Sequence, residues 1–223
     1  TKYELIEGLP AEGCAFFPND NAYTKAMYDQ TAGKKILYTL EGEGDVRAEE
    51  IAVSDQGSTF KVIYSRGSFE ATTCLLGRHN VLNILGCVAI ALELGLSEKQ
   101  IVAGIAKIQP VEHRLQLIKG AGGVTVIDDA FNSNPAGAKA AMDVLAAFPG
   151  RKFVVTPGMI ELGEREALEN GLFGEAMAKA ADVVFLIGPR HTRPIYEGLE
   201  RAGFAMEQVF VVKSLAEASA QMG

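Results

Sequence analysis

The spacing of apolar residues divides the chain into a first part rich in strands and a second part in which strands and helices alternate. Before about residue 76, short alternating runs predict strands at Lys35–Leu40 and Ser58–Tyr64, and a glycine-containing turn returns the second strand as a hairpin through Ser68–Leu76. From His79 to Gly95 the apolar residues recur at helical spacing instead. This change of period predicts a helix.

A second helix is predicted from Ser97 to about Lys107. Ser97 is followed three residues later by Gln100, which is the pattern of a capping box. Gln109-Pro110 ends this helix, because the residue before a proline is disfavoured in helical conformation. We therefore expect a domain boundary here, with one domain over residues 1–109 and another over residues 110–223.

Beyond Pro110, short apolar runs alternate with helical patterns. The expected strands are Val124–Ile127, Lys152–Thr156, Val183–Ile187 and Val209–Val212, and the expected helices are Pro135–Ala147, Arg165–Ala180, Pro194–Ala202 and a last one from Ser214. Such alternation is typical of a parallel sheet covered on both faces. The predicted fold class is α/β: a mixed sheet with helices, then a Rossmann-like, doubly wound domain that we expect to lack its last strand.

Composition narrows the possible partners. Of the 223 residues, 48% are hydrophobic and 22% are charged, enough apolar material for a core, and the net charge of -7 argues against a nucleic-acid partner. Without an apolar run of about 18 residues, no membrane span is expected. Cys14, Cys74 and Cys87 show no CxxC spacing, so we expect buried free thiols in a reducing cytosol.

One polar cluster opens the helix at His79, within Gly77-Arg78-His79-Asn80-Val81-Leu82-Asn83. Asn80 and Asn83 are three residues apart and share a helix face. An amide donates and accepts hydrogen bonds at once, which suits the edge of an adenine ring. The alternative is a helix start that Asn80 caps.

Another cluster, Glu112-His113-Arg114, follows the predicted boundary. The rigid fork of donors on Arg114 matches phosphate oxygens, and an arginine at a hinge would act when domains close. The alternative is a surface ion pair with Glu112.

The third cluster runs from Asp128 to Pro135 and reads Asp-Asp-Ala-Phe-Asn-Ser-Asn-Pro. We expect it at the carboxyl end of a parallel strand, where open α/β sheets bind ligands. Asp129 would then hold ribose hydroxyls and Asn132 a polar ligand group, unless the loop only begins a helix at Asn134. The stretch Thr156–Gly163 follows the next strand, so we expect it at the same sheet edge, with Glu161 as a site carboxylate or a plain loop residue.

No phosphate-cradling loop is recognisable in these 223 residues. Neither GxGxxG nor GxxxxGK[ST] occurs, and Ala32-Gly33-Lys34-Lys35 lacks the second glycine and the hydroxyl residue. The three histidines show no metal-ligand spacing. The isolated chain is therefore predicted not to hydrolyse ATP.

The order of these motifs resembles the Mur ligase family: GRHNVLN, then HR at a domain start, then DDAFNSNP, then GMIELG over residues 158–163. The resemblance covers about residues 77–190. It implies a cytoplasmic, ATP-dependent ligase that makes an amide bond in peptidoglycan precursor synthesis through an acyl phosphate, with Mg²⁺ on the phosphates. Its substrates would be a UDP-N-acetylmuramoyl peptide and an amino acid or dipeptide, D-alanyl-D-alanine being the expected one. This chain would be the later part of such an enzyme.

The resemblance also implies roles for individual residues. Asn80 would contact adenine with support from His79 and Asn83, Arg114 would reach the phosphates, and Asp129 would hold ribose with Asn132 near the nucleotide. Asn134 and Glu161 would face the substrate. Thr1–Leu9 resembles the family segment whose lysine is carbamylated to hold a second magnesium, so Lys2 would be that lysine.

Two departures leave the added amino acid open. Pro18-Asn19-Asp20-Asn21 keeps only one of the family's two aspartates, and Pro157-Gly158 stands where the family has glycine-aspartate. Other amide ligases, of the folate or cyanophycin type, remain alternatives. So does a non-catalytic nucleotide-binding or regulatory module of the same fold.

Overall fold

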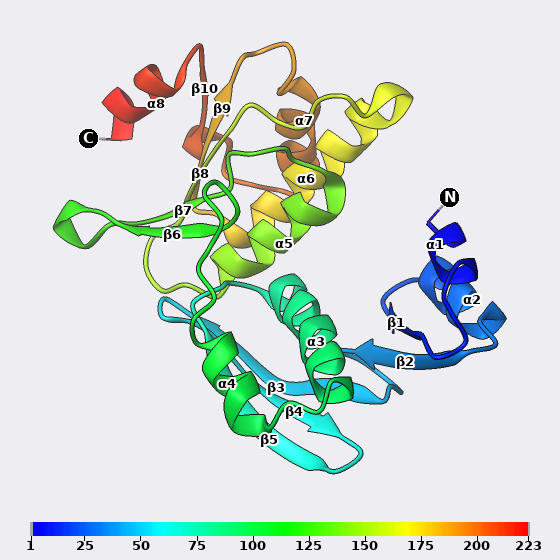
Figure 1. Ribbon diagram of the computed structural model, residues 1–223. Coiled ribbons are helices and arrows are strands. Elements are labelled where there is room, and N and C mark those ends of the chain that lie inside the picture. Colours follow the sequence, from blue (N-terminus) through cyan, green and yellow to red (C-terminus); the bar gives the residue numbers. More distant parts are fainter. Residues whose placement is uncertain (1, 223) are drawn as a thin grey trace. The chain divides into compact units, whose positions relative to one another are not determined.

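The computed structural model describes residues 2–222, which form two compact units that divide between Pro110 and Val111. In the first unit the elements are α1 (Glu4–Glu7), β1 (Cys14–Pro18), α2 (Ala22–Gln30), β2 (Lys34–Thr39), β3 (Val46–Ser54), β4 (Gly57–Tyr64), β5 (Gly67–Thr73), α3 (Arg78–Glu93) and α4 (Glu98–Ile105). Figure 1 shows them in blue to green.

The first unit is built on a mixed five-stranded sheet in the order β1-β2-β3-β4-β5. β1, β2 and β3 pair in parallel, whereas β3, β4 and β5 pair antiparallel. The predicted hairpin is confirmed as β4–β5. Helices α3 and α4 pack on this sheet through a core that includes Val62, Val81 and Leu85 (Figure 1).

Side-chain alternation along β1 places a second layer on the other face of the sheet. Ala15 and Phe17 are buried with Ile6 of α1 and Met27 of α2, whereas Phe16 between them packs against the α3 core. Successive side chains of a strand point to opposite faces. The unit is therefore a sheet covered by α3 and α4 on one side and by α1 and α2 at one end of the other.

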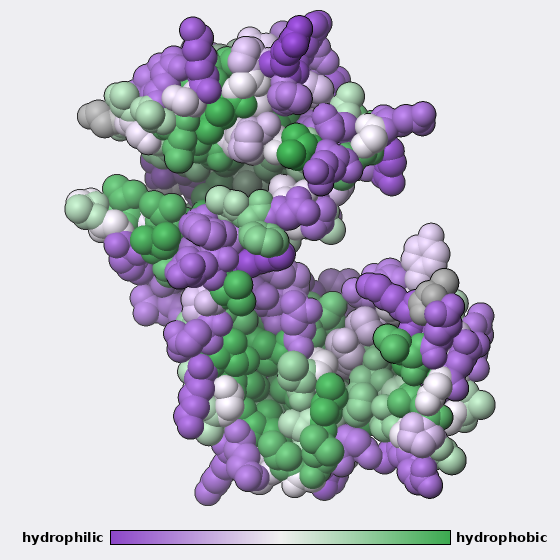
Figure 2. Space-filling view, turned by 45° about the horizontal axis from the view of Figure 1, so that its top comes forward, coloured by the Kyte–Doolittle hydropathy of each residue, from purple (hydrophilic) through white to green (hydrophobic). Residues whose placement is uncertain are grey.

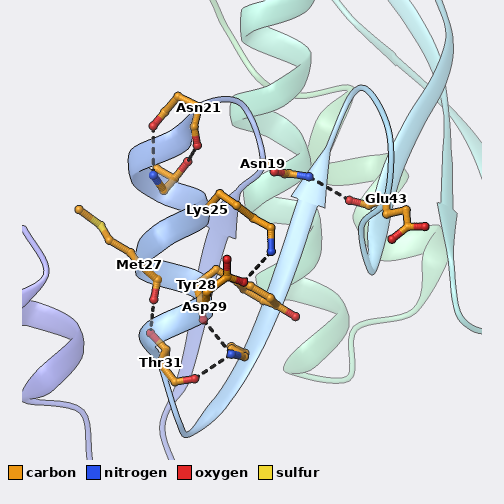
Figure 3. A network of polar contacts seen from close by, with 10 residues as sticks. Asn19, Asn21, Lys25, Met27, Tyr28, Asp29, Thr31 and Glu43 are labelled. Atoms are coloured by element: carbon orange, nitrogen blue, oxygen red, sulfur yellow. Dashed lines mark hydrogen bonds and ion pairs between the residues drawn. The ribbon is translucent and has the colours of Figure 1, made fainter.

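Polar contacts fix α2, which the sequence analysis did not anticipate (Figure 3). The side chain of Asn21 accepts from the backbone N–H groups of Tyr23 and Thr24 at 2.9 and 3.0 Å and caps the helix start. At the other end the Nζ of Lys35 donates to the carbonyls of Tyr28 and Thr31 at 2.7 and 2.8 Å. A cation is favourable at a helix carboxyl end, so a β2 lysine ties α2 to the sheet.

The second unit contains β6 (Gln116–Lys119), β7 (Thr125–Asp128), α5 (Pro135–Ala146), β8 (Phe153–Thr156), α6 (Glu166–Ala180), β9 (Val183–Ile187), α7 (Arg193–Arg201), β10 (Val209–Val212) and α8 (Leu215–Met222). A parallel sheet runs in the order β10-β9-β8. Val184 and Leu186 face the core with α5, α6 and α7, whereas Val183 and Phe185 face Ala218 of α8. Helices on both faces confirm the predicted α/β class.

One part of the predicted sheet is wrong. β7 pairs antiparallel with β6 in a separate two-stranded sheet, and it does not pair with the parallel strands. The reason is that Gly120–Gly123 turns the chain tightly, with Gly122 and Gly123 at φ of 67° and 80°, so the preceding residues pair with β7 first. The loop after β7 and the loop after β8 therefore follow strands of different sheets, contrary to the expected shared edge.

Surface exposure corrects smaller expectations. Cys74 and Cys87 are exposed and Cys14 is only half-buried, although all three were expected inside. Figure 2 shows hydrophilic and hydrophobic residues interspersed over the visible surface, and scattered apolar residues are normal on protein surfaces. Among the described residues, no helix is both long and apolar enough to cross a membrane.

Candidate nucleotide site

The GRHNVLN motif forms the start of α3. Gly77 precedes the helix with φ of 90°, a left-handed conformation that favours glycine, and it makes no side-chain cap. Asn80 does not cap the helix, contrary to the alternative considered above: its Nδ2 donates to the backbone carbonyl of Leu76 at 2.9 Å. This bond fixes the half-buried amide at the helix start. An amide has a second N–H donor and an acceptor oxygen beyond it.

The neighbours of Asn80 differ in exposure. His79 is half-buried, and Asn83 lies exposed one turn further along α3. Arg78 forms an ion pair with Glu41 at 2.9 Å, which ties the helix start to the segment after β2. The first turn of α3 thus presents a fixed amide next to an exposed one.

Lys2 lies exposed in the turn before α1, and Thr1 is outside the described residues. Over residues 2–222 no group of three or more histidine, cysteine, aspartate or glutamate side chains is arranged to hold a metal ion. The role of Lys2 stays a prediction.

In the second unit, the HR motif and the DDAFNSNP motif lie against each other. The Nδ1 of His113 is 2.8 Å from the Oδ2 of Asp128, and the other oxygen of Asp128 accepts from the Ala130 N–H at 3.1 Å. The hydrogen bond with His113 holds the pKa of Asp128 below its usual range. Asp128 is thus a charged anchor between the two motifs.

Asp129 supplies a second anchor. Its Oδ1 accepts from the backbone N–H of Leu115 at 3.1 Å, and the Leu115 side chain is buried. His113 and Leu115 both have left-handed backbone conformations, at φ of 61° and 48°. Non-glycine residues adopt this conformation at a cost and persist there when their surroundings hold them. Two successive aspartates hold this segment.

Arg114 lies between those two residues. Its guanidinium carbon is 4.3 Å from the centre of the Phe131 ring. Arg114 is exposed, and Phe131 is 63% exposed. The sequence analysis did not single out Phe131; the only available signal was a large aromatic residue in a polar loop.

The remaining predicted residues are placed as follows. Asn132 is exposed in the loop before α5, and Asn134 caps α5 by accepting from the Gly137 N–H at 2.9 Å. Glu161 is exposed, with φ of 64°. The loop that carries Glu161 is anchored by the buried Asn170, which makes two hydrogen bonds to the backbone of Met159 at 2.9 and 2.8 Å.

The cluster formed by Arg114, Asp128, Asp129 and Phe131 combines a cationic fork, carboxylates and an aromatic ring; Asp128 is half-buried and the other three side chains are exposed. An arginine fork suits phosphate oxygens, and carboxylates accept hydrogen bonds from hydroxyl groups. This combination suits a protein that binds a phosphorylated ligand carrying hydroxyl groups, such as a nucleotide.

Models of two known protein families match the chain. The Mur ligase middle domain model matches residues 1–91, and the model described as Mur ligase, glutamate ligase domain, matches residues 113–222. The chain belongs to the Mur ligase family.

Individual relatives share this assignment. The chain is 32% identical over 184 residues to UDP-N-acetylmuramoyl-tripeptide--D-alanyl-D-alanine ligase of Escherichia coli (strain K12), which covers 82% of this chain and 40% of the relative. The same-named enzyme of Buchnera aphidicola is 30% identical over 189 residues, covering 84% of this chain and 41% of the relative. The chain thus spans about two fifths of the length of these relatives.

Solved structures agree with the fold. MurF from Acinetobacter baumannii superposes with a TM-score of 0.85 at 28% identity, covering 99% of this chain and 47% of that one. MurF ligase from Thermotoga maritima in complex with ADP superposes with a TM-score of 0.82, covering 100% of this chain and 49% of that one; at 20% identity this match speaks for the fold alone.

Proposed function

We propose that this chain carries the nucleotide-contacting parts of an ATP-dependent ligase that forms an amide bond in cytoplasmic peptidoglycan precursor synthesis. The observation that carries the proposal is the match of two Mur ligase models in order along one chain, together with the hydrogen bonds that join His113 to Asp128 and Leu115 to Asp129. The use of ATP is proposed on the resemblance of the GRHNVLN and DDAFNSNP motifs to those of the Mur ligase family.

The proposed substrates are UDP-N-acetylmuramoyl tripeptide and D-alanyl-D-alanine, after the names of the relatives from Escherichia coli and Buchnera aphidicola. A second candidate is a ligase that adds a single amino acid. It is favoured by a 35% match over 133 residues to UDP-N-acetylmuramate--L-alanine ligase of Rhodospirillum rubrum, which covers 56% of this chain and 28% of that relative.

The proposed reaction has two steps. A carboxylate oxygen of the peptide attacks the terminal phosphorus of ATP, which gives an acyl phosphate and ADP. The amine of the incoming substrate then attacks the acyl carbon, inorganic phosphate leaves and the nitrogen loses a proton. Magnesium would offset charge on the phosphates.

In this reaction Arg114 is proposed to donate to phosphate oxygens that gain charge. Asp129 is proposed to accept from ribose hydroxyls, with Asn132 as a further contact to the nucleotide, and Asn80 is proposed to bind the adenine edge with support from His79 and Asn83. Donors aimed at developing charge stabilise a transition state more than the ground state. Arg114 is therefore expected to matter more for turnover than for nucleotide affinity.

The test uses the complete gene product that contains this chain. Arg114→Ala is expected to lower kcat about 100-fold, corresponding to about 3 kcal/mol, and to leave the Kd for ATP within a few-fold. Arg193→Ala is the matched control, because Arg193 is exposed in the same unit and pairs with Glu197 at 2.9 Å. Product formation is measured with tripeptide plus D-alanyl-D-alanine and with UDP-N-acetylmuramate plus L-alanine.

Four outcomes decide the proposal. ATP-dependent product with the first substrate pair supports the MurF-like reaction, and product with the second pair supports the L-alanine-adding candidate. Nucleotide binding without product from either pair would favour a non-catalytic module. A turnover within two- to threefold of wild type in Arg114→Ala would remove Arg114 from the site.

A further inference from the structure

Phe131 stands out among the exposed apolar residues because a charged side chain covers its ring. Its side chain is 63% exposed, and the guanidinium carbon of Arg114 is 4.3 Å from the ring centre. Contacts below about 6 Å between a guanidinium and an aromatic face are attractive. The pairing explains why a large apolar residue stands in a loop of aspartates and asparagines.

The backbone on both sides leaves little freedom in how this pair is presented. Arg114 is flanked by two left-handed residues, His113 and Leu115. His113 is held by Asp128 at 2.8 Å, and the Leu115 N–H is held by Asp129 at 3.1 Å. The same loop continues within two residues to Phe131. The anchors that hold the backbone of Arg114 and the ring that supports its side chain thus come from one short segment.

We propose that Phe131 is a positioning residue for Arg114: its ring holds the guanidinium in one orientation, with the edge donors directed outward, before a phosphate arrives. This inference rests on the proposed function, since it assigns Phe131 a role only through the contact of Arg114 with phosphate.

The physical reason lies in the flexibility of arginine. A free arginine side chain occupies many rotamers and loses that freedom when it binds. A guanidinium that lies flat on a ring keeps its in-plane N–H donors available, because the ring uses the face and not the edge. Preorganisation of this kind lowers the cost of reaching the transition state.

The experiment is a double-mutant cycle in the complete gene product. The single variants are Phe131→Leu, which keeps an apolar side chain but removes the aromatic face, and Arg114→Ala; the double variant combines them. Phe131→Tyr is the rescue variant. The values of kcat and of KM for ATP are measured for each under saturating peptide substrate.

Phe131→Leu is expected to lower kcat about two- to fivefold, the factor that corresponds to a cation–π contact at an exposed site, with KM for ATP unchanged within twofold. Phe131→Tyr is expected to match wild type. In the Arg114→Ala background, Phe131→Leu is expected to have no further effect, which a merely structural role of Phe131 would not produce.

Two results would overturn the inference while leaving the proposed function intact. One is that Arg114→Ala is slow while the single variant Phe131→Leu is as fast as wild type. The other is a loss from Phe131→Leu that is equally large with and without Arg114. An Arg114→Ala enzyme as fast as wild type would instead show that the proposed role of Arg114 is wrong, and the role of Phe131 would fall with it.

Discussion

The contact between α6 and α7 leads to a sharp prediction about stability. Gly171 and Gly174 of α6 meet Gly198 of α7, and all three are buried. A Cβ atom added at Gly198 would lie 2.1 Å from the carbonyl oxygen of Gly171 and 2.9 Å from its carbonyl carbon. These obstacles are backbone atoms, which no rotamer change can move. Gly198→Ala should therefore force the two helices apart.

The size of the effect follows from that distance. Ordinary non-bonded contacts lie at about 3.5 Å or more, so the helices would separate by roughly 1.4 Å at the crossing. A gap of even 0.5–1 Å costs about a quarter to a half of the dispersion energy of the atoms beside it. Fully buried Ile195 and Leu199 lie on α7 in this layer. We expect the free energy of unfolding of the second unit to fall by about 3 kcal/mol or more.

The assay is urea unfolding of the 223-residue chain. Unfolding is monitored by hydrogen exchange, so that peptides of α6 and α7 report on their own unit. The chain contains no tryptophan, which makes fluorescence a poor probe. Gly137→Ala is the matched control: Gly137 is in α5 of the same unit, and its added Cβ would meet the Asn134 side chain at an ordinary 3.6 Å. The control is expected to be neutral or about 0.5–1 kcal/mol more stable.

If Gly198→Ala changed the stability of the second unit by less than about 1 kcal/mol, or by the same amount as Gly137→Ala, the close approach of α6 and α7 would not be a stabilising contact of the protein. A loss seen equally in peptides of the first unit would also contradict the argument, because the obstacle lies wholly within the second.

Two further predictions concern charge and catalysis. The His113 contact lowers the pKa of Asp128 in the folded state, so this carboxylate stabilises the fold above its unfolded pKa, and the contribution is lost as the pH falls through the lower folded value. The difference in the free energy of unfolding between wild type and Asp128→Asn, measured by urea unfolding, should therefore shrink between pH 6 and pH 3. A difference that stays constant over this range would contradict the argument. The 223-residue chain alone should release no phosphate from ATP, since its residues contain no GxxxxGK[ST] loop; steady release that Asp129→Ala abolishes would show the reverse.

The elements that sequence patterns predicted well are those whose signals are local. α4 has both halves of its expected capping box, with Ser97 and Gln100 exchanging hydrogen bonds, and α5 begins at Pro135 with Asn134 as its cap. The strands β8, β9 and β10 are continuous apolar runs between helices, and they form the expected parallel sheet. In each case a few neighbouring residues determine the structure.

The β6–β7 hairpin shows why a similar apolar run was misplaced. Val124–Ile127 looks like a buried parallel strand, but Val124 and Val126 are 59% and 47% exposed. Apolar runs of four residues do not reveal their pairing partner, because parallel and antiparallel strands share the same composition. The sequence signal for the hairpin was the three glycines Gly120, Gly122 and Gly123, which favour a tight reversal of the chain.

The candidate site was predictable in its residue types but not in its contacts. Polar clusters marked Arg114, Asp129 and Asn80 because several functional groups stand close together in sequence. The bond from Asn80 to the Leu76 carbonyl and the ring of Phe131 beneath Arg114 depend on backbone conformation at Gly77, His113 and Leu115. Left-handed conformations at non-glycine residues carry no reliable sequence signal.

The bonds of Asp129 affect how any substitution there is interpreted. Its Oδ1 holds the Leu115 N–H, which keeps the left-handed backbone beside Arg114 in place. A carboxylate has two oxygens and about four acceptor positions, so it has the capacity to hold this N–H and a ribose hydroxyl together. Removing the carboxylate would release the segment that presents Arg114 as well as the proposed ribose contact. A loss of activity in Asp129→Ala would therefore combine two effects. Substitutions at Arg114 and Phe131 leave the Asp129 anchor intact, so only these substitutions separate the phosphate contact from the backbone that supports it.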